Sequence, residues 1–174
     1  MTTSNITGAG KNAGGAGNTG SDDAVSAREY LLNHNVLCLA TSSKDEPWVS
    51  PVFYAIHSGQ LVFLSAPHTR HSSNIRTNPL VSASVQDDYK NWEEIKGIQL
   101  QGRVEQLTET APVIAAYSEK FPVTGPDAPP QIARALDKIG WYSLQVELLY
   151  FIDNSKGLGH RVELDPALVL QHNR

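Results

Sequence analysis

Cysteine and methionine each occur only once in this chain, and basic residues do not dominate it. The single cysteine, Cys38, excludes an internal disulfide framework and a metal site built from several cysteines. Fourteen Lys and Arg stand against 18 Asp and Glu, which gives the 174-residue chain a formal net charge of −4. Proteins that bind nucleic acid broadly usually carry a basic face. The composition therefore argues against nucleic acid as a partner.

Long hydrophobic runs are also missing. No apolar stretch approaches the ~18 residues that a membrane-spanning helix needs. The first residues are polar and rich in glycine, without the apolar centre of a secretory signal peptide. We therefore expect a cytoplasmic protein with no membrane contact.

The motifs of several enzyme classes are absent. No G-x-G-x-x-G follows an apolar strand, so a Rossmann fold is not expected. No H-E-x-x-H, G-x-S-x-G or paired-carboxylate pattern indicates a catalytic group. His68 and His71 lie close in sequence but have no third ligand nearby, so no metal site is predicted. If the protein is an enzyme, a cofactor should supply the reactive group.

Residues 8–12, GAGKN, match a phosphate-binding P-loop only poorly. Asn12 follows the lysine where the motif requires Ser or Thr, and no apolar strand precedes the segment. The segment belongs to a stretch of mostly Gly, Ala, Asn, Thr and Ser, which buries too little apolar surface to offset its ordering entropy.

The chain is long enough for one domain with a real core. We expect three parts: a disordered glycine-rich tail at residues 1–21, a domain at 22–166 and a C-terminal tail at 167–174.

Short apolar or alternating segments separated by turn residues predict a mainly β protein. A helix is expected from residue 21 to the polar stop at 33–35. Strands are expected at 36–41, 48–56, 61–64, 80–86, 98–107, 141–152 and 161–164, and further helices at 69–76, 109–121 and 131–139. This order favours an antiparallel barrel or sandwich with flanking helices.

Two residues in the first strands carry specific expectations. Cys38 lies in the apolar run 36–40 and is interpreted as a buried core thiol. Pro51 lies inside a predicted strand, and a proline there requires an edge or a bulge. Backbone groups around Pro51 should then be free to meet a ligand or another subunit.

A basic turn between a strand and a short helix is the strongest candidate site. Arg70 lies in it, next to the expected amides of the helix N-terminus, with the hydroxyls of Ser65 and Thr69 and the ring of His71 nearby. A guanidinium, hydroxyls and helix amides are groups that hold phosphate. The alternative is that Arg70 is a solvated turn residue and Thr69 only caps the helix.

Three stretches resemble the pyridoxamine 5′-phosphate oxidase-like split barrels that bind FMN. Residues 46–54, EPWVSPVFY, resemble the family's first strand pair. Residues 61–82 resemble its strand, basic turn and N-[IL]-x-x-N-P-x-V-S segment, and residues 98–104 its "G-x-A/V" strand. Farther along, the sequences KFPV at 120–123 and IDNSKGLG at 152–159 are similar to the YhbP-like branch.

The resemblance implies a six-stranded split barrel that forms a homodimer, with FMN at the subunit interface. It places the FMN phosphate near Ser65, Thr69, Arg70 and His71. The isoalloxazine and ribityl would lie along Ser50, Pro51, Val52 and Phe53, with Leu64 nearby, and Asn154 and Lys156 would lie in a loop directed toward the partner's flavin. No catalytic side chain and no metal ligand are implied, and the small-molecule substrate is not specified.

This chain departs from the oxidase at several positions. Ser50 replaces a basic residue and His71 replaces a lysine, and the arginine-rich elements that hold pyridoxal phosphate are absent. Vitamin B6 oxidation is therefore not expected. The alternatives are a non-catalytic carrier or sensor of flavin or haem, a deazaflavin protein, and a structural dimer that has lost its cofactor.

Overall fold

The structure is a computed structural model that describes residues 19–44 and 46–171. Its strands are β1 (Val36–Ser43), β2 (Glu46–His57), β3 (Gln60–Ser65), β4 (Leu80–Gln86), β5 (Lys96–Gln106), β6 (Gly140–Asp153) and β7 (Arg161–Leu164). Its helices are α1 (Thr19–Asn33), α2 (Arg70–Thr77), α3 (Ala111–Lys120), α4 (Pro130–Leu136) and α5 (Pro166–Leu170), with short 3-10 turns η1 (Trp92–Glu94), η2 (Pro122–Thr124) and η3 (Asn154–Lys156).

One antiparallel sheet forms the body of the molecule. The strand order is β3-β2-β1-β4-β5-β6-β7, and pairing of β3 with β6 closes the first six strands into a barrel. Strand β7 pairs with β6 outside this barrel. The expected mainly β, six-stranded antiparallel split barrel with flanking helices is confirmed, and of the two architectures left open by the strand pattern it is the barrel that forms.

Strand alternation decides which side chains fill the barrel. On β1 the side chains of Leu37 and Leu39 are fully buried, while Cys38 between them faces outward. Phe63 of β3 stacks on Tyr142 of β6, with ring centroids 5.2 Å apart. These inward rows form one hydrophobic core, because every second residue of each strand points to the same face.

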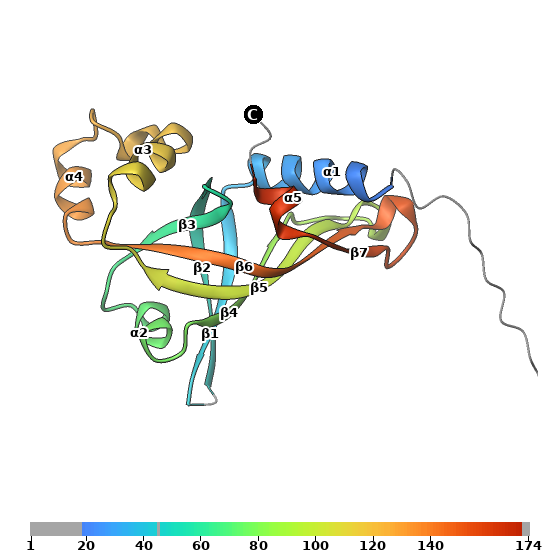
Figure 1. Ribbon diagram of the computed structural model, residues 1–174, viewed down its shortest axis with the longest axis horizontal. Helices are drawn as coiled ribbons and strands as arrows, with labels where there is room; N and C mark the ends of the chain where they lie inside the picture. The colour runs from blue at the N-terminus through green and yellow to red at the C-terminus, as the bar shows by residue number, and fades with distance from the viewer. Residues whose placement is uncertain (1–18, 45, 172–174) are drawn as a thin grey trace, which may run out of the picture.

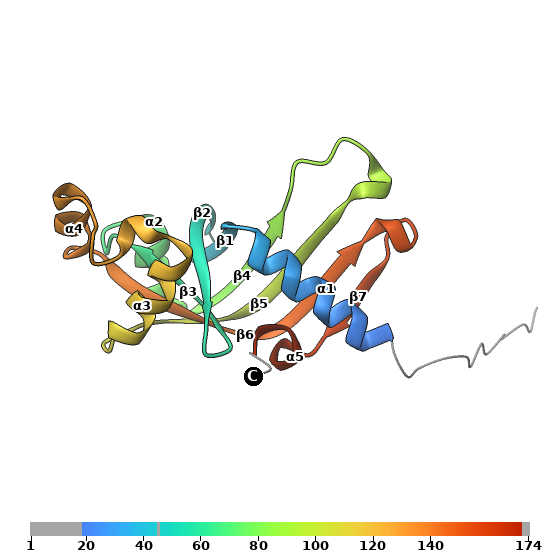
Figure 2. The ribbon, with the colours of Figure 1, turned by 90° about the horizontal axis from the view of Figure 1, so that it is seen from above.

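The helices cover the barrel at separate places (Figure 1). Helix α2 packs on β1, α3 on β2 and β3, and α1 packs with α5 over the extended part of the sheet. Figure 2 shows α1 lying across that extended part. Among the described residues no helix is long and apolar enough to cross a membrane.

The chain ends differ from the sequence expectation. The predicted N-terminal tail, including residues 8–12, lies outside the described residues except for 19–21, which belong to α1. The predicted C-terminal tail was placed too early. Residues 167–170 are part of α5. Asp165 caps this helix by accepting a hydrogen bond from the Ala167 amide, and Val169 and Leu170 are almost completely buried. A helix of five residues is too short to show a clear hydrophobic period, so only its packing against α1 reveals it.

Cys38 is not the buried core thiol that its apolar neighbours suggest. Leu37 and Leu39, on either side of it, point inward, so Cys38 points to the outer face of the sheet and is half-buried there. An unbroken apolar run gives no period from which the inward face can be read.

Gly102 permits the close approach of β5 and β6. The register of these strands shifts between Gln101 and Gly102. A Cβ at position 102 would lie 2.0 Å from the carbonyl oxygen of Gln145, which is a backbone atom. Only glycine fits where another backbone comes this near.

We predict that Gly102→Ala lowers the free energy of unfolding by ~2 kcal/mol or more, because β6 must shift to admit the methyl group. Urea denaturation measures the change. Glu105→Ala, an exposed substitution on the same strand, should change stability by about 0.5 kcal/mol or less. Equal stability of the two variants would contradict the close approach.

Candidate functional site

The end of β3 and the start of α2 bring three of the predicted phosphate ligands together. The Ser65 hydroxyl lies 2.6 Å from Nε2 of His71 and 3.1 Å from the Thr69 hydroxyl. The Thr69 hydroxyl and His71 Nε2 are 3.2 Å apart. Ser65 comes from a barrel strand and the other two from the helix start, so the turn between them folds back on itself.

Thr69 begins helix α2. Its backbone is extended, and its side-chain oxygen accepts a hydrogen bond from the Ser72 amide at 3.4 Å, as an N-cap residue does. The amides of Arg70 and His71 have no hydrogen-bond partner within the described residues. Unpaired amides at a helix start carry partial positive charge and bind anions readily. The Thr69 cap is therefore present, and it leaves these two amides available to an anion, so the phosphate role stays a prediction.

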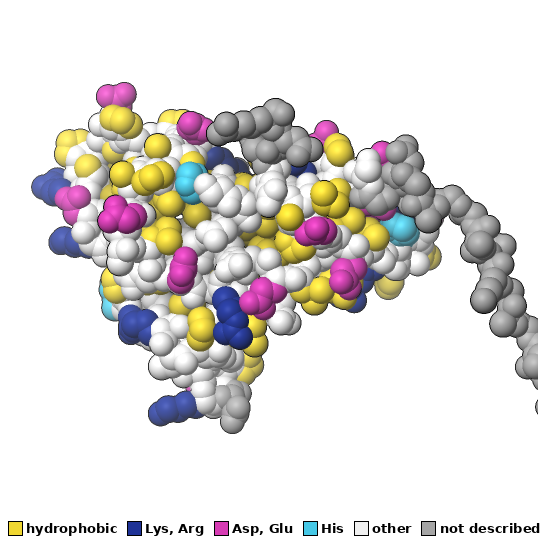
Figure 3. Space-filling model, in the orientation of Figure 1, with side chains coloured by type: hydrophobic (Ala, Val, Ile, Leu, Met, Phe, Trp, Pro, Cys, Tyr) yellow, Lys and Arg dark blue, Asp and Glu magenta, His cyan; other side chains and the backbone are white. Residues whose placement is uncertain are grey.

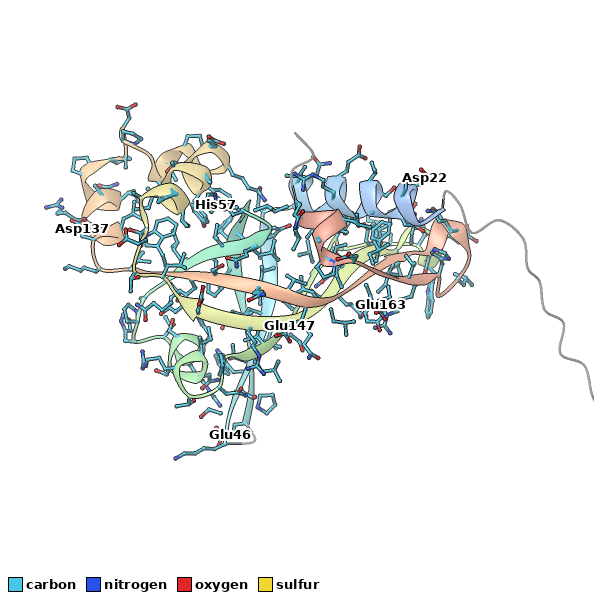
Figure 4. The ribbon with its side chains drawn as sticks, in the orientation of Figure 1. Asp22, Glu46, His57, Asp137, Glu147 and Glu163 are labelled. Carbon is cyan, nitrogen blue, oxygen red and sulfur yellow. The ribbon has the colours of Figure 1, made fainter. Side chains whose placement is uncertain are left out.

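Arg70 extends from this cluster toward the tip of the β1–β2 hairpin. Its Nη2 lies 2.8 Å from Oε2 of Glu46, and its guanidinium lies 4.5 Å from the centre of the Trp48 ring. The side chains of Arg70 and Glu46 are 44% and 75% exposed. An ion pair this exposed contributes little, so a phosphate can take Arg70 from Glu46 at small cost. Figure 4 shows Glu46 at the hairpin tip, and Figure 3 shows Lys and Arg side chains around α2 and this hairpin.

His71 is neutral in this setting. Burial lowers the pKa of its imidazole from the ordinary value, because desolvation disfavours the charged form. The neutral ring forms one side of the cluster with Ser65, as donor or acceptor according to its tautomer. His71 therefore brings a hydrogen-bonding nitrogen where the oxidase has a permanent charge.

The edge of β2 next to the cluster is open. Strands β2 and β3 pair only from Tyr54 and Phe63 toward the hairpin turn, so residues 46–53 of β2 have β1 as their one strand neighbour. Pro51 lies in this open segment, as a strand proline requires. Ser50 and Val52 point inward and are buried, while Pro51 and Phe53 are exposed.

The remaining predicted residues lie away from α2. Leu64 is half-buried and packs with the cluster around Trp141. Asn154 and Lys156 lie in η3, at the opposite end of the molecule (Figure 1). The Asn154 amide donates to the Trp92 carbonyl at 2.7 Å, and Lys156 pairs with Asp23 of α1. Within one chain these two residues organise their own loop and do not meet the phosphate cluster.

The outer face of the sheet is shallow and carries small side chains. It holds a cavity of about 370 Å³ across β1, β2, β4, β5 and β6. Its outward lining residues are Cys38, Ala40, Val49, Ser82, Ser84, Gln99, Gln101, Leu148, Tyr150 and Arg161. Arg161 lies over the Tyr150 ring, 3.8 Å from its centre, and forms one wall. Val49 and Phe53 leave 59% and 55% of their surface exposed.

A family model for pyridoxamine 5′-phosphate oxidase matches residues 26–152, which include the barrel, the open β2 edge and the α2 cluster. The chain belongs to this family. A UPF0306 protein from Photorhabdus laumondii is 27% identical over 137 residues, covering 76% of this chain and 89% of the relative.

Solved structures share the family fold. HutZ, a haem storage protein from Vibrio cholerae, superposes with a TM-score of 0.60 at 21% identity, covering 72% of this chain and 91% of HutZ. An FAD-binding protein from Mesorhizobium loti gives a TM-score of 0.57 at 22% identity, covering 72% and 90% of the two chains. Proteins of this fold therefore include a haem protein and a flavin protein.

Sequence reasoning did not find Glu46 and Trp48, which orient Arg70 in this family member. Both residues fall inside the family-like stretch 46–54, but their link to Arg70 spans more than 20 positions.

Another unforeseen contact joins α2 to the barrel, where buried Asn74 donates to the Thr41 hydroxyl at 3.1 Å. The alternation of β1 indicates only that Thr41 points inward.

We predict that His71 makes the protein sensitive to acid. Because the folded-state pKa of His71 is lowered, the folded protein binds fewer protons than the unfolded chain just below about pH 6.5. The contribution of neutral His71 to the free energy of unfolding is therefore present above that pH and is lost as the pH falls. His71→Gln should therefore lose less stability than the wild type between about pH 7.5 and about pH 5 in urea denaturation. His68→Gln, which removes an exposed histidine of the same turn, is the control, and identical pH profiles for wild type and His71→Gln would refute the prediction.

Proposed function

We propose that this protein is a homodimeric FMN-binding protein of the oxidoreductase type. The observation that supports it most is the convergence of hydroxyls, a neutral imidazole, two unpaired helix amides and an exchangeable guanidinium beside an open strand edge. This donor set fits the phosphate of FMN, and the adjacent edge suits an extended, partly planar molecule.

The phosphate would be held at the start of α2. The amides of Arg70 and His71 donate from the helix N-terminus, and Ser65 adds a hydroxyl. Arg70 leaves Glu46 and supplies charge, and its stacking on Trp48 keeps the guanidinium near the site. Charge-assisted hydrogen bonds of this kind are stronger than neutral ones and give the site its affinity for a dianion.

The isoalloxazine and ribityl would lie along the open edge of β2. Backbone groups of residues 50–53 on this edge have no strand partner on one side. The exposed ring of Phe53 packs against Phe121 of the segment after α3, with centroids 5.4 Å apart, and the Phe53 carbonyl accepts a hydrogen bond from Tyr117 at 3.4 Å. Helix α3 therefore limits how far the planar ring can extend along β2.

Bound FMN would supply the electron transfer, since flavins accept and donate electrons. The side chains of this chain would bind the phosphate, align the ring and shield it from water. No residue of the cluster is assigned as an acid or base in the reaction, and the cytoplasmic location expected from the sequence remains a prediction.

The outer face of the sheet supports a dimer. Small residues at its centre, Cys38, Ala40, Ser82 and Ser84, leave a depression that larger rim side chains of a second copy could enter. Exposed Val49 lies on this rim. A second copy seated here would cover apolar surface that is otherwise exposed to water, and its η3 loop is the element through which Asn154 would approach the flavin.

We predict that Arg70→Ala weakens FMN binding about tenfold or more, because one charge-assisted contact to the phosphate is lost. Titration calorimetry measures the affinity. Arg76→Ala is the matched control, since Arg76 lies on the same helix but bonds Pro67 and Ser73. Glu46→Gln should bind FMN at least as tightly as the wild type, because it releases Arg70. Unchanged FMN affinity in Arg70→Ala would overturn the phosphate assignment.

Riboflavin separates a phosphate effect from a folding effect. It lacks the phosphate, so its affinity should be the same for the wild type and Arg70→Ala. The visible spectrum of the purified protein, before and after addition of FMN or haem, distinguishes a flavin protein from a haem protein. A colourless protein that takes up neither would favour the structural dimer, and bound flavin that NAD(P)H does not reduce would favour storage or sensing.

We predict that Ala40→Arg converts the dimer to a monomer. The new charge would be buried at the centre of the proposed interface without a partner, which costs ~3 kcal/mol or more and raises the dimer dissociation constant about a hundredfold. Sedimentation equilibrium measures the mass. Asp137→Lys, an exposed position just after α4 that does not line the cavity, should leave it unchanged. A wild-type protein that is monomeric at all concentrations would refute the dimer.

A further inference from the structure

A second cleft lies at the other end of the barrel from α2. Its volume is about 810 Å³, within the range of pockets that hold small molecules. It is enclosed by α1, the β2–β3 hairpin, α3 and α5. Figure 4 shows His57 of the hairpin between α3 and α1, and Figure 1 shows α2 on the opposite side of the barrel. None of its lining residues belongs to the outer-face cavity proposed for the dimer.

The lining combines an apolar floor with two cations. Leu32, Ile56 and Leu170 are among the apolar residues that line the cleft, and Leu32 leaves 49% of its surface exposed. Arg28 from α1, which donates a hydrogen bond to the Val169 carbonyl at 2.9 Å, and Lys120 from α3 also line the cleft, together with exposed Glu119. Pockets of mainly apolar lining with a few placed polar groups are typical of sites that bind amphipathic small molecules.

Lys120 is the group that defines the chemistry of the cleft. Its ammonium donates to the His34 carbonyl at 2.5 Å and lies 4.2 Å from the centre of the buried Tyr54 ring. Within the described residues no carboxylate pairs with it. Burial lowers the pKa of Lys120 to about 8, because the charged form is poorly solvated there.

These contacts leave Lys120 able to serve a ligand. A lysine ammonium has three donors, and the His34 carbonyl takes one. The contact with His34, just after the last residue of α1, holds the side chain in place at the negative end of that helix. A carboxylate that entered the cleft would pair with a positioned and partly desolvated charge, which is a stronger contact than a solvated surface pair.

We propose that this cleft is a second ligand site, which takes a small monocarboxylate with an apolar body. The carboxylate pairs with Lys120 from the side of Arg28, and the aryl or alkyl body covers Leu32 and Ile56. The cleft shares no residue with the α2 cluster or the β2 edge at 50–53, although α3 borders both places.

The test is titration calorimetry of the full-length protein with phenylacetate and octanoate, and with the uncharged phenylacetamide. At least one of the two acids should bind saturably. If phenylacetate binds, phenylacetamide should bind about tenfold or more weakly, because the amide lacks the negative charge. Because the acid and the amide are compared on the wild-type protein, the result does not depend on whether a variant folds. No saturable binding of either acid, or equal affinity for phenylacetate and its amide, would overturn the proposal.

Two variants locate the binding. Lys120→Met should lower the affinity for the acid about tenfold or more, and Ala116→Phe should abolish binding by filling the cleft. Lys138→Met, which removes a lysine exposed beyond α4, is the matched control. Wild-type affinity in both Lys120→Met and Ala116→Phe would place the acid elsewhere and refute the proposal. FMN affinity measured on the same samples keeps this outcome separate from the test of the flavin site.

Discussion

Pairing of β3 with β6 closes the sheet, and the position of the candidate site depends on it. On one edge β3 pairs with β2 only as far as Tyr54 and Phe63, while on its other edge it pairs with β6 as far as Ser65 and Gly140. The two strands therefore diverge, and residues 46–53 of β2 keep an open edge beside the turn into α2. Closure thus removes much of the sheet edge, and residues 46–53 are one of the described segments whose backbone groups are free for other contacts.

The α2 cluster is held by contacts of unequal strength. The Thr69 cap and the buried Asn74–Thr41 hydrogen bond fix the helix on the barrel, because buried polar groups are costly to leave unpaired. The exposed Arg70–Glu46 pair contributes little to stability and can be exchanged. A rigid set of amides and hydroxyls, together with the exchangeable guanidinium of Arg70, is suited to binding an anion reversibly.

Local pattern accounted for most of the secondary structure but not for how elements face one another. Turn residues and alternation predicted the seven strands and four of the five helices within a few positions. The same reasoning assigned Cys38 to the core, where an apolar run carries no period, and missed α5, whose stability comes from burial of Val169 and Leu170. The grouping of Ser65, Thr69 and His71 was within reach of sequence reasoning because they lie within seven residues of one another.

The sequence by itself determined the succession of strands and helices along the chain, the helix cap at Thr69, the edge required by Pro51 and the residue types of the α2 cluster, since each depends on neighbouring residues. Only the tertiary structure decided the partners of Arg70, the outward position of Cys38 and the cleft around Lys120. Those contacts join residues far apart in the chain, and they depend on strand register and barrel closure, which the packing of the whole sheet sets.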